Sequence, residues 1–215
     1  MNVKGFRTAS ILGLALALSA LWPAAVGAAG GTVEVEHQRG PLVNAWFTSF
    51  DTSGCVETDT FVSANQPTDH HQADQVSTVV ASVSVFVYDL CTETALLDAA
   101  GYADDLSLDH LTVSNQMDAA SLDAVIPLTD IATNEIFDVQ VDVAWTGTSD
   151  IHRDHSNTND QYPGGCHVLN RWNGSGRSAS AWGSVSDGVT NFTPDATDQA
   201  EIGAVHDGFV VIGCA

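Results

Sequence analysis

The chain has 215 residues, 44% of them hydrophobic, and its formal net charge is −21 because only six Lys and Arg face 27 Asp and Glu. Such a length suits one domain with a sizeable core. Nucleic acids and anionic membranes require clustered cationic side chains, which this composition lacks. The composition therefore excludes a nucleic-acid-binding protein and predicts an acidic globular domain.

Residues 1–28 have the three parts of a secretory signal peptide. Lys4 and Arg7 form a positive start, residues 11–22 form a short apolar core, and Val26-Gly27-Ala28 suits cleavage. The apolar run is shorter than the roughly 20 residues that a spanning helix needs. No later segment is longer. We expect residues 29–215 to be a single domain, secreted or extracytoplasmic, with no membrane span in its mature form.

Cleavage would remove the only lysine of the chain and leave four arginines against 27 acidic side chains, a formal charge of −23. Self-repulsion of this size destabilises a compact state unless it is screened or neutralised. Three explanations remain open. The charge either keeps a solvated surface soluble, or matches a salty medium, or holds divalent cations such as calcium.

The mature chain contains four cysteines, and an even number outside the leader predicts two disulfides in an oxidising compartment. Four cysteines permit three pairings. We expect the sequential one, Cys55 with Cys91 and Cys166 with Cys214, because each half of the chain is then closed on itself. Their spacing does not match zinc motifs, and no C-x-x-C occurs.

In the first half of the mature chain, alternation of apolar and polar residues predicts strands at 32–37, 42–50, 56–63 and 79–89. The strand at 79–89 carries apolar residues on both faces and is expected to be partly buried on both. Residues 64–75 are polar and rich in turn formers, which predicts a loop. Residues 93–102 fit either a short helix or a strand.

The second half begins with the clearest signal, a hairpin of residues 122–128 and 137–145. Pro127 lacks a backbone donor, which predicts a sheet edge or a bulge there. A loop is expected at 147–165, followed by strands at 177–185 and 201–212. Strands follow one another with few helical stretches between them. The fold class predicted is therefore all-β, an antiparallel β-sandwich of eight to ten strands with room for one short helix.

The predicted loop at 147–165 is rich in metal-ligand side chains. His152, Asp154 and His155 lie in it and His167 follows it, so zinc could gain three nitrogen ligands if the loop folds back. Calcium is a second option, although the run lacks the central Gly and distal Glu of an EF-hand loop. A solvated loop without a ligand is the third interpretation.

Two further groups of residues are candidates for binding. The predicted loop at 64–75 offers a smaller set of metal-ligand groups, namely Asp69, His70, His71 and Asp74. Exposed indoles could stack on sugar rings. Trp145 is in phase with core residues and is expected to be buried, whereas Trp172 precedes the turn-forming pair Asn173-Gly174 and is expected to be the exposed one.

The sequence contains no G-x-S-x-G elbow, no H-E-x-x-H motif and no phosphate-binding P-loop. The leading hypothesis is therefore an exported, non-enzymatic binding or surface-associated module of unknown ligand. The alternative is a metal-dependent hydrolase with its site in residues 150–167. There, a zinc ion would activate water and Asp154 would orient it.

Several short motifs are spread over most of the mature chain: Gly54-Cys55, Tyr88-Asp89-x-Cys91, Gly101-Tyr102, Gly147 after the strand at 137–145, Gly183 to Gly188, and Asn191 to Pro194. In these motifs the chain resembles secreted bacterial proteins of unassigned function. The resemblance implies a bacterial, exported β-domain. It implies no activity, cofactor or catalytic residue.

Overall fold

The computed structural model describes residues 33–67, 78–162 and 166–214, and at 33–38, 162, 166, 209–210 and 212–214 it describes the backbone alone. These residues belong to one compact unit, Gly31–Ala215. The predicted signal peptide at 1–28 and most of the predicted loop at 64–75 lie outside the described residues. Among the described residues, no helix is long and apolar enough to cross a membrane.

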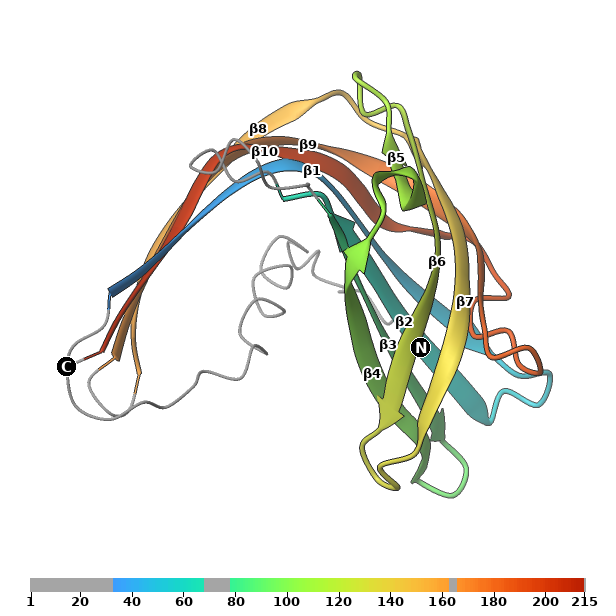
Figure 1. Cartoon of the computed structure of the whole chain (residues 1–215). Coiled ribbons are helices and arrows are strands. Elements are labelled where there is room, and N and C mark those ends of the chain that lie inside the picture. The colour runs from blue at the N-terminus through green and yellow to red at the C-terminus, as the bar shows by residue number, and fades with distance from the viewer. Residues whose placement is uncertain (1–32, 68–77, 163–165, 215) are drawn as a thin grey trace, which may run out of the picture. The chain divides into compact units, whose positions relative to one another are not determined.

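The described residues form antiparallel strands and one short 3-10 helix, which confirms the predicted all-β fold (Figure 1). In chain order these elements are β1 (Val33–Phe50), β2 (Val56–Asn65), β3 (Val79–Asp89), β4 (Thr94–Leu106), η3 (Leu108–His110), β5 (Leu111–Val113), β6 (Ala119–Asp130), β7 (Ile136–Gly147), β8 (His152–Tyr162), β9 (Cys166–Ser186) and β10 (Thr197–Cys214).

The strands form one sheet that closes on itself. Its order is β10-β1-β2-β3-β4-β6-β7-β9-β8, and β10 also pairs with β9, so the path from β1 through β9 returns to β1 by way of β10. β8 and β7 pair with successive stretches of the same long strand β9. The two sides of a closed sheet differ, because one faces the enclosed core and the other faces solvent.

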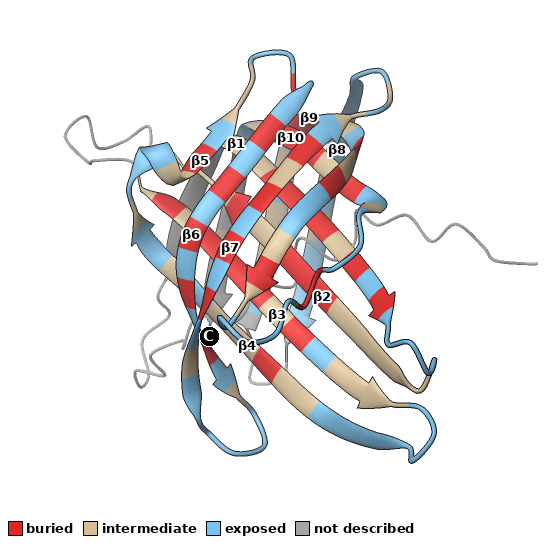
Figure 2. Ribbon diagram, turned by 90° about the vertical axis from the view of Figure 1, so that its right-hand side faces the viewer, coloured by how far each residue is buried: buried red, intermediate tan, exposed pale blue. Residues whose placement is uncertain are grey.

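The core is built by strict alternation, which Figure 2 shows as buried and exposed bands along β6 and β7. The inward residues of these two strands are the apolar ones predicted from the period of two. Each fully buried side chain of this kind contributes roughly 1.5–3 kcal/mol. The inward residues of the hairpin are Leu122, Ala124, Ile126, Leu128, Val139, Val141, Val143 and Trp145.

Buried polar groups tie the two sides of the core together. The indole of Trp145, 1% exposed, donates from Nε1 to the backbone oxygen of Asn44 on β1 at 2.8 Å. The segment between β9 and β10 folds onto the core through Phe192 and Thr193. The Thr60 hydroxyl donates to the Phe192 carbonyl at 3.0 Å, and the Thr193 hydroxyl accepts from the Val185 amide at 2.9 Å. These bonds satisfy groups whose burial is otherwise costly.

Pro127 lies on β6, which is paired with both β4 and β7 and is therefore not an outer edge strand. Its ladder to β4 consists of the two pairs Ala99–Asp130 and Ala100–Thr129, so Pro127 falls just beyond it. Gly101 of β4 approaches there so closely that a Cβ would lie 1.8 Å from the Pro127 carbonyl oxygen. Proline has no backbone N–H to donate, and Pro127 lies where the hydrogen-bonded pairing of β6 with β4 has ended.

A disulfide joins Cys55 and Cys91, as predicted. Cys55 lies in the connection between β1 and β2, and Cys91 lies in the turn between β3 and β4. A carboxylate caps each of these two turns. Asp51 accepts hydrogen bonds from the backbone amides of Cys55 and Val56. Asp89 accepts them from the backbone amides of Cys91 and Thr92. The bond therefore joins two neighbouring turns that are each ordered by a carboxylate.

The structure decides two expectations about secondary structure. Residues 94–106 form strand β4, so the strand alternative for 93–102 is correct and the helical one is wrong. The predicted loop at 147–165 is wrong for residues 152–162, which form β8 and pair with β9 over their whole length. The polar side chains of β8 do not pack on the core, so the apolar period that would have predicted a strand is missing.

Candidate ligand-binding site

The four residues predicted to hold a metal lie on two adjacent strands. His152, Asp154 and His155 are on β8, and His167 is near the start of β9. Side chains alternate along a strand, so His152 and Asp154 share one face while His155 lies on the other. His167 is opposite Gln161, six residues beyond His155, or about 20 Å along the strand. The fold does not bring the four side chains together.

No three His, Cys, Asp or Glu side chains of the described segments lie close enough to hold one metal ion. His152 instead faces Glu201 of β10, with 3.8 Å between Nε2 and Oε1. β9 runs between these two strands, and a Cβ at its Gly176 would lie 2.1 Å from Oε1 of Glu201. Because Gly176 has no side chain, the side chains of His152 and Glu201 have room to approach each other above it.

Glu201 is a largely buried acidic residue whose carboxyl pKa is shifted. Its side chain is 19% exposed, and this burial raises the pKa of the carboxyl above its usual range, which the neighbouring His152 partly opposes. Asp154 adds to the rise through like charge. A pair of this kind is an ordinary surface contact, and it lacks a third group that would complete a metal site or a catalytic triad within the described residues.

Asp69, His70, His71 and Asp74, the second set of metal-ligand candidates, lie outside the described residues. The prediction made for them stays a prediction.

The tryptophans differ from expectation in one respect. Trp145 is buried, as predicted. Trp172 is only partly exposed, whereas Trp182 is 47% exposed, so the expectation that Trp172 is the exposed indole is wrong. Trp172 belongs to the continuous strand β9 and packs over Gly174, whose Cβ position lies 2.8 Å from its ring. The Asn173-Gly174 pair thus lies in a strand and forms no turn.

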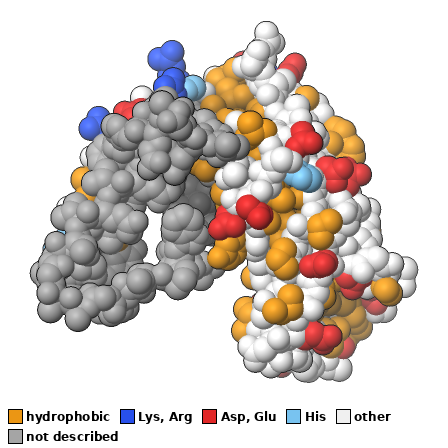
Figure 3. All heavy atoms as spheres, in the orientation of Figure 1, with side chains coloured by type: hydrophobic (Ala, Val, Ile, Leu, Met, Phe, Trp, Pro, Cys, Tyr) orange, Lys and Arg blue, Asp and Glu red, His pale blue; other side chains and the backbone are white. Residues whose placement is uncertain are grey.

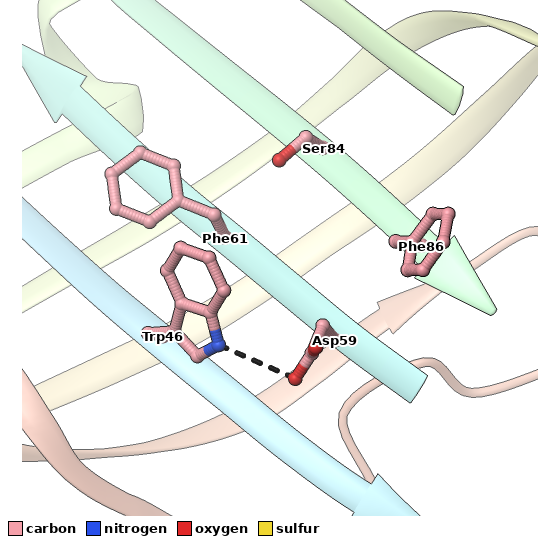
Figure 4. A pocket seen from close by; sticks show the side chains of 5 residues that line it. All are labelled: Trp46, Asp59, Phe61, Ser84 and Phe86. Carbon is pink, nitrogen blue, oxygen red and sulfur yellow. Dashed lines mark hydrogen bonds between the residues drawn. The ribbon is translucent and has the colours of Figure 1, made fainter. Parts of the chain in front are cut away.

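A hollow of about 240 Å³ lies on the outer side of β1, β2 and β3 (Figure 4). We call it the β1–β3 hollow. It is lined by Trp46, Asp59, Phe61, Ser84 and Phe86.

The sheet register brings these five residues together. Trp46 of β1 is opposite Phe61 of β2, which is opposite Ser84 of β3. Asp59 is likewise opposite Phe86. Residues that are opposite in adjacent strands share a face. Their neighbours in sequence point into the core, so the five lining side chains lie on the outer face of the sheet, where Phe61 is only 8% exposed.

Hydrogen bonds and ring contacts hold the walls in place. The indole of Trp46 donates from Nε1 to Asp59 Oδ1 at 3.3 Å, and the Thr48 hydroxyl donates to the same oxygen at 2.6 Å. Trp46 and Phe61 pack at a ring-centroid distance of 6.0 Å. Phe86, 39% exposed, stacks on Tyr88 with 5.9 Å between their centroids. The aromatic walls are therefore fixed before any ligand arrives.

The chemistry of the hollow is mixed. Three aromatic rings offer apolar surface, while Asp59 and Ser84 offer polar atoms between them (Figure 4). Asp59 Oδ1 accepts both hydrogen bonds, which leaves Oδ2 without a partner among the described residues. Such a surface suits a ligand that combines an apolar ring face with hydroxyl donors.

The sequence holds a signal for this hollow that the site predictions did not use. Trp46, Phe61 and Phe86 occupy the phase of their strands opposite to the buried Ala, Phe and Val residues. Aromatic residues in the outward phase of three consecutive strands would cluster if those strands are neighbours in one sheet. Only the pairing order of β1, β2 and β3 establishes that they are.

Comparison with models of protein families, with curated proteins and with solved structures finds no match for this chain.

Proposed function

We propose that the protein is an exported, non-enzymatic binding module and that its ligand is a neutral carbohydrate held in the β1–β3 hollow. The observation that carries this proposal is the placement of three aromatic rings around two polar side chains on the solvent side of the sheet. A soluble domain otherwise keeps such rings in its core. Trp46 is partly exposed and Phe86 is exposed on this outer face, while Phe61 is buried beside them, and exposed large aromatic residues are typical of binding surfaces.

A sugar ring matches both halves of this surface. Its C–H face packs on aromatic rings, and its hydroxyls can donate to Asp59 Oδ2 or exchange hydrogen bonds with Ser84. The hollow has a volume of about 240 Å³, just below the range of roughly 300–1,000 Å³ for pockets that enclose drug-sized ligands. It would therefore hold one ring of a longer chain that runs on across the sheet.

Export is part of the proposal. The leader at residues 1–28 supports it, as do four cysteines confined to the mature chain. The Cys55–Cys91 disulfide is the kind of bond that persists in oxidising compartments. Intact mass measurement of protein recovered outside the cell should give a chain that begins at or near Ala29. Recovery of the uncleaved chain in the cytoplasm would contradict this part.

The binding proposal is tested with mature protein, residues 29–215, and four neutral polysaccharides: cellulose, chitin, xylan and starch. Retardation in affinity gels containing each soluble form, and pull-down with each insoluble form, report binding. We expect retention by at least one of them. Phe86→Ala should weaken it about tenfold, because one stacked aromatic ring contributes roughly 1–1.5 kcal/mol.

Trp182→Ala is the matched control, because this indole is also exposed but lies on β9, away from the hollow. It should bind as the unchanged protein does. Trp46→Ala removes a ring together with the bond to Asp59, so its folding has to be checked by circular dichroism. Equal loss in the Trp182 and Phe86 variants would reject the hollow as the site. Absence of binding to all four polysaccharides would reject the ligand class.

A further inference from the structure

Four strands continue beyond the closed part of the sheet. β8 pairs with residues 166–176 of β9, the same stretch of β9 pairs with the end of β10, and that end pairs with residues 33–38 of β1. We call residues 33–38, 152–162, 166–176 and 203–214 the projecting sheet. In Figure 1 these strands run side by side toward the C-terminus.

One face of the projecting sheet collects arginine, histidine and amide side chains. This face is continuous with the core-facing side of β9, the side on which Ala179 and Ala181 are buried. Opposed residues share a face, and both guanidiniums and the imidazole are exposed. The opposed pairs on this face are Arg153 with Ser175, His155 with Asn173, and Asn157 with Arg171.

Neither Arg153 nor Arg171 has a hydrogen-bond or ion-pair partner within the described part of the chain. Arg177, by contrast, donates to the backbone oxygens of Ser149 and Gln116 and holds two connections in place. A protein with 27 acidic side chains offers many partners to an arginine. Two exposed arginines on one face, without a partner among the described residues, are able to bind an anion from outside.

The acidic side chains are mostly elsewhere. Asp207, opposite Asn173, shares this face, whereas Asp154 and Asp160 of β8 lie on the opposite one. In the face of the molecule seen in Figure 3, blue arginine side chains lie at the upper left with red acidic atoms beside them, and further red side chains are spread over the right-hand part.

We propose that this face binds a polysaccharide that carries carboxylate groups, with Arg153 and Arg171 each holding one carboxylate. The two arginines are separated by four positions in register, about 13 Å along the strands. Two exposed guanidiniums with this separation suit successive charged groups of an extended polymer. The guanidinium fork matches a planar carboxylate, and the amides of Asn157 and Asn173 can bond neighbouring hydroxyls.

Distance and salt allow such a polymer to approach a protein of negative net charge. Arg171 lies eight residues before Ala179, where the closed core begins, which is about 26 Å along the strand. The Debye length is about 8 Å at physiological ionic strength, so repulsion from the closed part is largely screened at that distance. Nucleic acid carries one charge per roughly 1.7 Å and would need many more cationic groups than two arginines.

The test uses mature protein and polygalacturonate, with fully methyl-esterified polygalacturonate as the matched neutral probe. Affinity electrophoresis at low salt should show retardation by the acid form and none by the ester. Arg153→Gln and Arg171→Gln should each weaken binding about tenfold, since a charge-assisted hydrogen bond contributes roughly 1.5 kcal/mol or more. Arg171→Lys should retain part of the affinity because it keeps the charge but loses the fork.

Asp160→Asn is the control variant, because it changes net charge by one unit on the opposite face of β8. Its affinity should be unchanged. Binding that survives both arginine substitutions, or equal binding of the ester, overturns the proposal. Equal binding of an oligothymidylate through the same arginines overturns the choice of polymer. Phe86→Ala should leave polygalacturonate binding intact, so this inference and the proposal for the hollow fail independently.

Discussion

Two kinds of carboxylate with a shifted pKa occur among the described residues. Asp51, Asp89, Asp130 and Asp187 accept backbone amides at turns, and these hydrogen bonds hold the pKa of each carboxyl below its usual range. Glu201 behaves in the opposite way, because burial raises its pKa. The first group therefore favours the folded state in its ionised form, while the ionised form of Glu201 disfavours it.

Glu201→Gln should stabilise the folded protein at pH 7. Above its raised folded pKa, Glu201 is ionised in both states and the folded state bears the cost of burying that charge. This destabilisation disappears as pH falls through the folded pKa toward the unfolded one. Urea unfolding followed by tryptophan fluorescence should give a higher midpoint for the variant at pH 7 and equal midpoints below about pH 4.

Asp51→Asn provides the contrast at the same scale. Because the folded pKa of Asp51 is lowered, its contribution is present above the unfolded pKa and is lost as pH falls. The variant should therefore have a lower midpoint than the unchanged protein at pH 7 and converge with it in acid.

A Glu201→Gln variant that is less stable at pH 7 would show that the contact with His152 outweighs burial.

Among the elements, the turns joined by Cys55 and Cys91 carry a constraint that acts mainly on the unfolded chain. The bond spans 36 residues of sequence. The double variant Cys55→Ala, Cys91→Ala should lose about 2–4 kcal/mol of unfolding free energy. Urea unfolding measures this loss. An unchanged midpoint would mean that the unfolded chain is already compact in this region.

The second predicted disulfide remains a prediction, although the register places the backbone of Cys166 directly opposite that of Cys214. Neighbouring strands bring Cα atoms of opposed residues to about 4.5–5.5 Å, a distance that a disulfide can span. Peptide mapping without reduction should recover Cys55 linked to Cys91 and Cys166 linked to Cys214. A peptide that links Cys91 to Cys166 would contradict the sequential pairing.

The elements that pack on the core were the predictable ones. The hairpin of β6 and β7 appears in the sequence as two runs of alternating residues because one face of each strand is buried. β8 has polar residues on both faces, so nothing in its composition separates it from a loop. Its strand conformation comes from backbone hydrogen bonds to β9, a partner that the local sequence does not reveal.

At the scale of the whole molecule, a formal net charge of −21 belongs to a chain whose described strands form a sheet that closes on itself. Repulsion between these charges opposes the compact state and is weakened by salt. Raising NaCl from 20 mM to 500 mM should raise the thermal midpoint, by about 2–4 °C for each 1 kcal/mol of repulsion removed. Differential scanning fluorimetry measures it.

Calcium chloride at the same ionic strength separates screening from binding. An equal rise in NaCl and CaCl₂ indicates screening alone, and a larger rise in CaCl₂ indicates bound ions that stabilise the folded state by mass action. A midpoint that does not respond to either salt would mean that the charges are too far apart to destabilise the fold.

The sequence by itself determined the fold class and the positions of the core-facing strands, because burial of one strand face leaves a period of two in the local sequence. The pairing of Cys55 with Cys91, one of three that four cysteines permit, is established by the structure. The tertiary structure alone decided which strands are neighbours. That order separates His155 and His167 of the expected metal site, brings Trp46, Phe61 and Phe86 into one hollow, and places Arg153 and Arg171 on one face. Pairing between distant strands has no local signature, since backbone hydrogen bonds are the same for every sequence.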